Sequence, residues 1–156
     1  MSSLPLCFAS ATDHQKLYSD QTGKFPAQSS RGYQYVVIMY DYDSNTILSK
    51  PLKSRQASEL TAAWSSLHEK LEANSFAPAL HILDKECSEE LKKPFRKNNF
   101  DFQGVPPHSH RRNAAERAIQ TWKNHFCAGL ATCDPNFPLT EWDLLLPQAE
   151  ITLNLL

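Results

Sequence analysis

Three acidic residues stand where a divalent cation could be held. Asp20 and Asp84 each end a short segment predicted to be a strand, and Glu116 lies in a segment with helical periodicity. Mg²⁺ takes oxygen ligands and keeps several waters, so a few carboxylates are enough to bind it. Two such ions about 4 Å apart can activate a water or hydroxyl group and stabilise the leaving oxygen in phosphodiester chemistry. Each acid alone is also an ordinary turn or surface residue, so this chemistry requires a fold that brings all three together.

The third acid belongs to the stretch from Pro106 to Phe126, which is predicted to become a long helix. Its apolar residues recur at helical spacing, and Glu116 stands at the edge of that stripe. The same flank carries cationic and amide side chains: Arg112, Asn113, Gln120 and Lys123. A carboxylate among such groups suits a metal ion and a phosphate backbone, whereas the structural alternative is a solvated flank with an Arg112–Glu116 pair.

The elements that must position these residues follow an α/β order. Strands are predicted at 17–20, 33–42, 46–52, 80–83 and 100–105. Helices are predicted at 55–73 and from residue 88, and the long helix that contains Glu116 is predicted to run to about residue 133. Two further helical segments are predicted near residues 140 and 147, the first with a Thr140–Asp143 capping box. A hairpin followed by alternating helices and strands predicts a mixed sheet with helices on its faces. Ligands collect at strand ends in such sheets.

Composition narrows the class of protein. The 156 residues suit one domain, with residues 1–15 as an unstructured leader because they show no clear period. The net charge of −1 gives no general attraction to nucleic acid, so such binding needs a local patch. No apolar run is long enough to cross a membrane, and no targeting signal is found. The four cysteines form no C-x-x-C pair, so we expect reduced thiols in an intracellular protein.

Four motifs resemble, in order, those of the catalytic core of retroviral and retrotransposon integrases. They are SDQTGKFP around Asp20, YDYDS around Asp41, LDKECS around Asp84 and PPHSHRRNAAERAIQTWK around Glu116. The resemblance covers roughly residues 16–156 and implies an RNase H-like α/β fold, with a five-stranded mixed sheet flanked by helices. We expect truncation at the C-terminus, because the last run, PQAEITLNLL, ends while still apolar and periodic.

The resemblance also implies a site and its partners. Asp20, Asp84 and Glu116 match the three catalytic acids that bind two Mg²⁺ (or Mn²⁺) ions, whereas Asp41 matches a hairpin aspartate outside the triad. The residues implied or favoured as DNA contacts are Arg111, Arg112, Asn113, Gln120 and Lys123. The implied reaction cuts a DNA 3′ end and joins it to target DNA. A homo-oligomer acting on element ends and target DNA is implied, in the nucleus if the substrate is chromosomal.

Departures from the family pattern keep other hypotheses open. Lys85 follows the second aspartate where asparagine is usual, and an ammonium there would compete with a divalent cation. His108 and His110 have no further ligands at zinc spacing. The protein is therefore predicted to be an enzyme if the acidic triad is functional. The alternative is a catalytically inactive or domesticated nucleic-acid- or protein-binding fragment, and a third hypothesis is an RNase H-type nuclease.

Overall fold

The computed structural model describes residues 16–73, 80–83, 92–93, 96, 101–104 and 110–155. Of residues 16, 80–83, 101–104 and 110–114 only the backbone is described. The strands are β1 (Lys16–Gln21), β2 (Tyr35–Asp41), β3 (Thr46–Leu52), β4 (Leu80–Leu83) and β5 (Asp101–Gly104). The helices are α2 (Ala57–Ala73), α4 (His110–Ala131), the 3₁₀ helix η1 (Leu139–Leu145) and α5 (Leu146–Leu155). The helix predicted from residue 88 falls largely outside the described residues.

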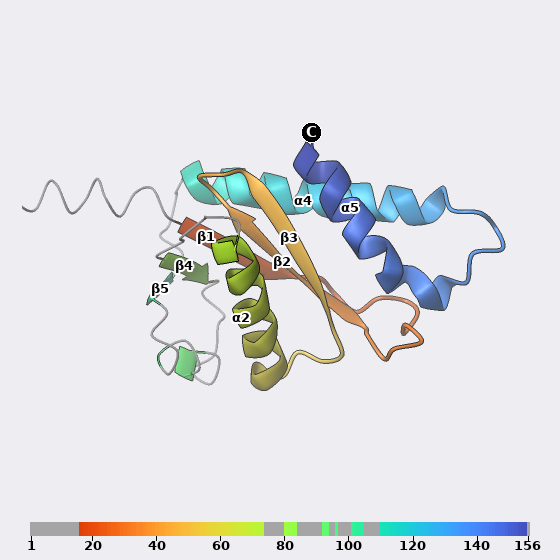
Figure 1. Cartoon of the computed structure of the whole chain (residues 1–156), viewed down its shortest axis with the longest axis horizontal. Coiled ribbons are helices and arrows are strands. Elements are labelled where there is room, and N and C mark those ends of the chain that lie inside the picture. The colour runs from red at the N-terminus through yellow and green to blue at the C-terminus, as the bar shows by residue number, and fades with distance from the viewer. Residues whose placement is uncertain are drawn as a thin grey trace, which may run out of the picture.

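The strands join in the order β3-β2-β1-β4-β5 (Figure 1). Strand β2 runs antiparallel to both β1 and β3, whereas β1 pairs parallel with β4, and β4 with β5. The β2–β3 hairpin closes between Asp41 and Thr46, with Asn45 at a φ of 58°. Asparagine tolerates this left-handed conformation. The predicted α/β class is confirmed.

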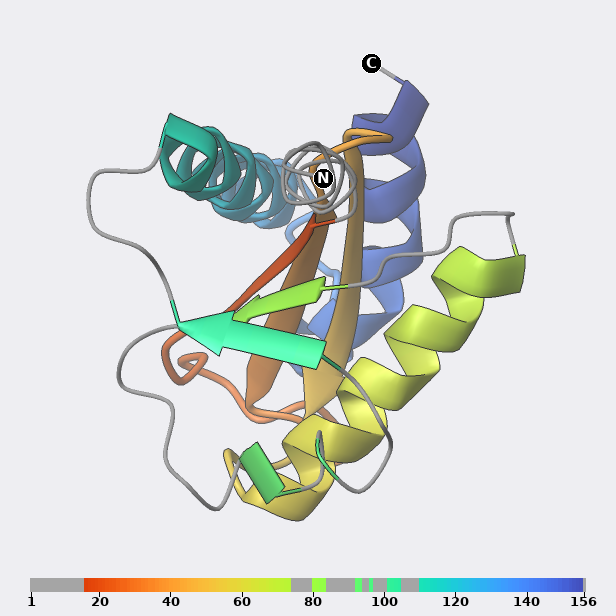
Figure 2. The same ribbon diagram turned by 90° about the vertical axis from the view of Figure 1, so that its left-hand side faces the viewer.

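Alternating side chains of β2 divide the interior into two cores. Val36, Ile38 and Tyr40 point to one face, where α4, η1 and α5 pack. Val37 and Met39 point to the other face, against α2. Figure 2 shows α4 and α2 on opposite sides of the sheet. Because both faces are covered, β2 reads as one continuous apolar run, which is why its strand signal is so strong.

The two long helices bury the stripes that their periodicity predicts. Helix α2 buries Leu60, Ala63, Trp64, Leu67 and Leu71, and helix α4 buries Ala115, Ile119, Trp122 and Phe126. The two tryptophans are therefore core residues. Helix α4 ends at Ala131, two residues before the predicted end. Its buried stripe fixes the rotation of the helix, and hence the side on which its polar flank lies.

Helix α5 closes the outer edge of strand β3. Asn154 Oδ1 accepts the N–H of Ile47 at 2.8 Å, and Asn154 Nδ2 donates to the carbonyl of the same residue at 2.8 Å. One turn earlier, Glu150 Oε2 accepts the N–H of Ser49 at 3.2 Å, and its other oxygen is paired with Lys70 of α2. An edge strand otherwise exposes such groups to pairing with another chain. These contacts anchor α5 to the sheet.

One local prediction is wrong. Thr140 and Asp143 were expected to form a capping box, but Pro138 caps η1 without a side-chain hydrogen bond, and Asp143 is bound by Arg31 instead. Pro147 does lie in the first turn of α5, where proline is tolerated. Among the described helices, none has the length and apolar character needed to cross a bilayer.

Candidate functional site

Strand β1 carries Asp20 to the end of the sheet on the face covered by α4. Tyr18, two residues earlier, belongs to the core formed with that helix, and side chains two residues apart share a face. Asp20 is therefore directed to the α4 side. Its side chain is 49% exposed, so the carboxylate lies at the surface where a strand ends. This is the position expected for a ligand-binding acid in an α/β sheet.

Helix α4 brings Lys123 onto this carboxylate. Lys123 Nζ lies 3.2 Å from Asp20 Oδ2, and the lysine side chain is 31% exposed. Glu116 is exposed on the same helix, seven residues before Lys123. Seven residues make about two turns, or roughly 10 Å of rise, so Glu116 and Lys123 lie on one flank. The structure thus places the predicted acids Asp20 and Glu116 on neighbouring elements, with Lys123 paired to the first.

These donors suit a hard cation, subject to one competition. Asp20 and Glu116 offer carboxylate oxygens at the surface, where Mg²⁺ could keep much of its water. The ammonium of Lys123 already neutralises Asp20, so a cation at this carboxylate must displace it. Competition was expected from Lys85, which lies outside the described residues; the ammonium that the structure shows beside Asp20 is that of Lys123. In the described part of the chain, no group of three or more His, Cys, Asp or Glu side chains forms a ready metal site.

The remaining predicted site residues are only partly described. Asp84 and Lys85 lie outside the described residues, so the third acid of the predicted triad is not placed. Arg111, Arg112 and Asn113 fall in the first turn of α4, of which only the backbone is described. Gln120 is exposed, and its Nε2 donates to Asn124 Oδ1 at 2.9 Å. Its amide is therefore held along the flank of the helix.

A polar clamp that sequence reasoning missed holds the loop after β1. Arg31 makes a two-pronged contact with Asp143, with Nε to Oδ2 at 2.6 Å and Nη2 to Oδ1 at 2.7 Å. Its Nη2 also donates to Glu141 at 2.7 Å, and Ser30 Oγ donates to the other oxygen of Glu141 at 2.7 Å. Hydrogen bonds from Ser30 and Arg31 lower the pKa of Glu141 from its ordinary value. The clamp joins the loop to η1, and no short-range motif signals it.

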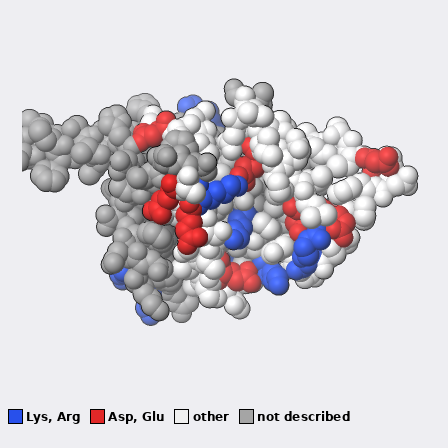
Figure 3. Space-filling model, in the orientation of Figure 1, with Lys and Arg blue, Asp and Glu red and all other residues white. Residues whose placement is uncertain are grey.

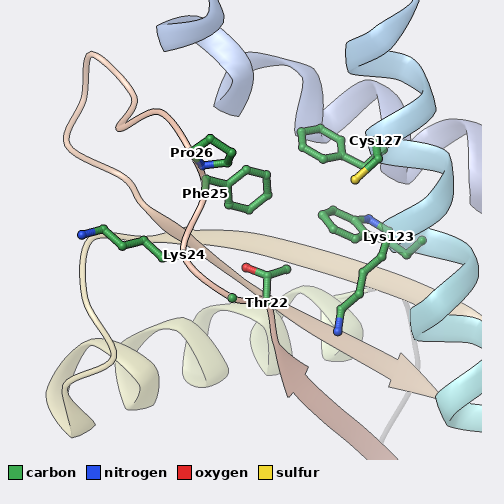
Figure 4. Close-up of a pocket in the computed structure, with 9 residues that line it drawn as sticks. Thr22, Lys24, Phe25, Pro26, Lys123 and Cys127 are labelled. Atoms are coloured by element: carbon green, nitrogen blue, oxygen red, sulfur yellow. The ribbon is translucent and has the colours of Figure 1, made fainter.

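The same loop and α4 enclose a hollow of about 260 Å³ beside Lys123. Phe25 and Cys127 face each other across it from the loop and the helix (Figure 4). Its lining consists of Thr22, Gly23, Lys24, Phe25, Pro26, Trp122, Lys123, Phe126 and Cys127. Phe25 also stacks on Trp142, with ring centroids 4.2 Å apart and planes 8° apart. We refer to this hollow as the β1–α4 pocket.

On the face of α2 and α5, acidic and basic side chains lie beside one another rather than separating by sign. Figure 3 shows this interleaving over the described part of that face. The Lys70–Glu150 and Arg31–Glu141 pairs are examples. Such pairing offers little net attraction to a phosphate backbone. The site beside Asp20 lies instead at the junction of β1 and α4.

Comparisons with known proteins show the fold. No family model matches this sequence, and no curated protein matches it either. The catalytic core domain of BIV integrase aligns with 89% of this chain and 82% of its own, with a TM-score of 0.62 and 12% identity. The HTLV-2 integrase catalytic core domain in complex with magnesium, in a dimeric form, aligns with 89% of this chain and 84% of its own, with a TM-score of 0.60 and 18% identity. A chain of the simian T-cell lymphotropic virus intasome, in complex with a PP2A regulatory subunit, aligns with 89% of this chain and 48% of its own, with a TM-score of 0.67 and 17% identity.

These likenesses show that the chain has an α/β fold of the RNase H-like kind. Within that class, the fold is similar to that of integrase catalytic core domains. The family resemblance read from the four sequence motifs is thus supported by the three-dimensional structure. Identities of 12–18% show the fold alone, so activity and ligands rest on the residues of this chain.

Proposed function

We propose that this protein is a retroelement-derived integrase catalytic core, with the five-stranded mixed sheet of the RNase H-like fold. It would cut the 3′ ends of element DNA and join them to target DNA. The observation that carries the proposal is the convergence of β1 and α4, which puts Asp20 beside the helix flank that holds Glu116 and Lys123. The same arrangement occurs within a fold shared with integrase catalytic cores.

Asp20, Asp84 and Glu116 are proposed to hold Mg²⁺ or Mn²⁺, as two ions. Such ions supply electrostatic stabilisation and alignment for an in-line displacement at phosphorus, and no covalent enzyme intermediate is required. The magnesium in the HTLV-2 integrase core supports this choice of metal. Lys123 would then leave Asp20 and pair with a phosphate, since both partners offer it a negative oxygen. Arg111, Arg112, Asn113 and Gln120 would contact the DNA backbone along the same helix.

The proposed partners are element ends and target DNA, bound by a homo-oligomer. Structures of HTLV-2 integrase cores in dimeric and trimeric forms, and of an intasome from a simian T-cell lymphotropic virus, support assembly in this fold. Action on chromosomal DNA would place the protein in the nucleus.

The test is a cutting and joining assay on fluorescent oligonucleotides. Activity should require Mg²⁺ or Mn²⁺, and Asp20→Asn, Asp84→Asn or Glu116→Gln should each lower it by about two orders of magnitude or more, because bound metal stabilises the transition state by several kcal/mol. The matched control is Asp43→Asn, since Asp43 is an exposed acid in the β2–β3 turn. Undiminished activity in the Asp20 or Glu116 variant would remove that residue from the site.

A second candidate function is DNA binding without catalysis. It is favoured by the Lys123–Asp20 ion pair, which neutralises one of the proposed metal-binding acids. This hypothesis predicts binding that weakens steeply with salt, together with no turnover in either metal. An RNA–DNA hybrid in the same assay separates both hypotheses from an RNase H-type nuclease.

A further inference from the structure

The β1–α4 pocket has the features of a site for one planar aromatic group. Pockets for drug-sized ligands span about 300–1,000 Å³, so a hollow of about 260 Å³ suits a single ring system. Phe25 supplies a partly exposed aromatic ring to its wall, whereas the other two aromatic lining residues, Trp122 and Phe126, are buried. A ring such as that of Phe25 can stack with any nucleobase, because every base has a π-face.

The pocket opens beside a cation that can hold a phosphate. Of the two lysines in its lining, Lys24 extends away from α4, whereas Lys123 reaches toward Thr22 (Figure 4). The ammonium of Lys123 lies 3.2 Å from Asp20 and is only partly buried, so a phosphate can approach it. An apolar hollow with a cation at its mouth is complementary to a base that carries its own phosphate.

We propose that the β1–α4 pocket captures one unpaired nucleobase of the DNA strand whose phosphate is held by Lys123. This inference rests on the proposed function, because it takes the strand at Asp20 to be DNA. The captured base would set the register of the strand relative to Asp20. A base must be unpaired before it can enter the pocket, and the free energy needed to unpair it is smallest at DNA ends, so capture is favoured there.

The glycines of this chain allow a matched test. A Cβ atom added at Gly23 meets nothing within 4 Å, and Gly23 lines the pocket, so Gly23→Phe adds bulk at the hollow without removing a side-chain contact. Gly129 is equally open but lies outside the pocket lining, so Gly129→Phe is the control. Cys127→Phe fills the pocket from α4 and serves as the second variant. Circular dichroism verifies that all three variants fold.

The experiment moves a single abasic nucleotide through a five-nucleotide 3′ overhang. Affinity is measured by fluorescence anisotropy at low salt in EDTA. Wild-type protein should bind about tenfold more weakly when one particular base is missing, the loss expected for one stacked base. Gly23→Phe and Cys127→Phe should bind intact DNA about tenfold more weakly and lose nothing further at that position. Gly129→Phe should behave as wild type.

Equal affinity for every abasic position would overturn the inference, and so would a loss that persists unchanged in both filled-pocket variants. The latter result would place the base elsewhere and leave the hollow for an apolar group, such as a side chain of a partner protein. Metal-dependent cutting that continues alongside such a result would leave the proposed function standing. Absence of both DNA binding and cutting would count against the proposed function itself.

Discussion

Replacing Lys123 by glutamine should make Asp20 a better cation ligand while hardly affecting stability. The ion pair joins side chains that are 31% and 49% exposed, at 3.2 Å. Exposed pairs of this kind contribute about 0.2–1 kcal/mol. The free energy of unfolding should therefore fall by less than about 1 kcal/mol, a shift of under about 4 °C in Tm for a chain of this size. A cation no longer has to displace the ammonium, so the same energy should lower its Kd by about 1.5- to 5-fold.

The assay is a Mn²⁺ titration of the metal-free protein, followed by electron paramagnetic resonance of the free ion. Lys123→Arg keeps the charge and should bind Mn²⁺ as the wild type does. Lys24→Gln removes a positive charge that Figure 4 shows pointing away from α4, and should change the Kd least. The difference between Lys123→Gln and wild type should shrink in 1 M salt, where screening weakens the ion pair. A folded Lys123→Gln protein with unchanged or weaker Mn²⁺ binding would refute the competition.

Other contacts give further predictions. Asn154→Leu leaves the N–H and carbonyl of Ile47 without their side-chain partner, so urea unfolding should show a loss of about 1 kcal/mol; an unchanged midpoint would contradict closure of the edge by α5. Arg31→Gln should lower Tm by a few degrees, and more than Arg31→Lys, because the carboxylate of Asp143 is 5% exposed and loses both hydrogen bonds; equal Tm values would contradict the clamp. The lowered pKa of Glu141 means that its carboxylate stabilises the fold above the ordinary value of 4.5, an effect lost as pH falls through the lowered pKa. Glu141→Gln should therefore lower Tm at pH 7 and progressively less below pH 4.5, and a constant difference would contradict the linkage.

Local periodicity predicted which faces of the elements are buried. The stripe of α4 and the apolar run of β2 are visible in the sequence because they depend on neighbours within one element. The same stripe places Glu116 on a flank next to the sheet. The short strand pattern before Asp20 likewise assigned this residue correctly to a strand end. Its role as a metal ligand stays a prediction.

Contacts between distant segments could not be predicted in this way. Lys123 and Asp20 are 103 residues apart, and Arg31 and Asp143 are 112 apart. A pattern in one element gives its buried face but not the partner of each polar group. The capping box at Thr140 failed for the same reason, because Asp143 makes stronger charge-assisted bonds to Arg31 than a cap would provide. Lys123 was expected to contact DNA, and its ion pair with Asp20 needed the structure.

Asp20 and Glu116 are proposed to belong to one cation site. The most direct test is the anomalous scattering of Mn²⁺ in crystals of this protein. A peak is expected within about 2.5 Å of an Asp20 carboxylate oxygen, on the side facing Glu116, with Lys123 moved off Asp20. Manganese bound only elsewhere, with Lys123 still 3.2 Å from Asp20, would contradict it.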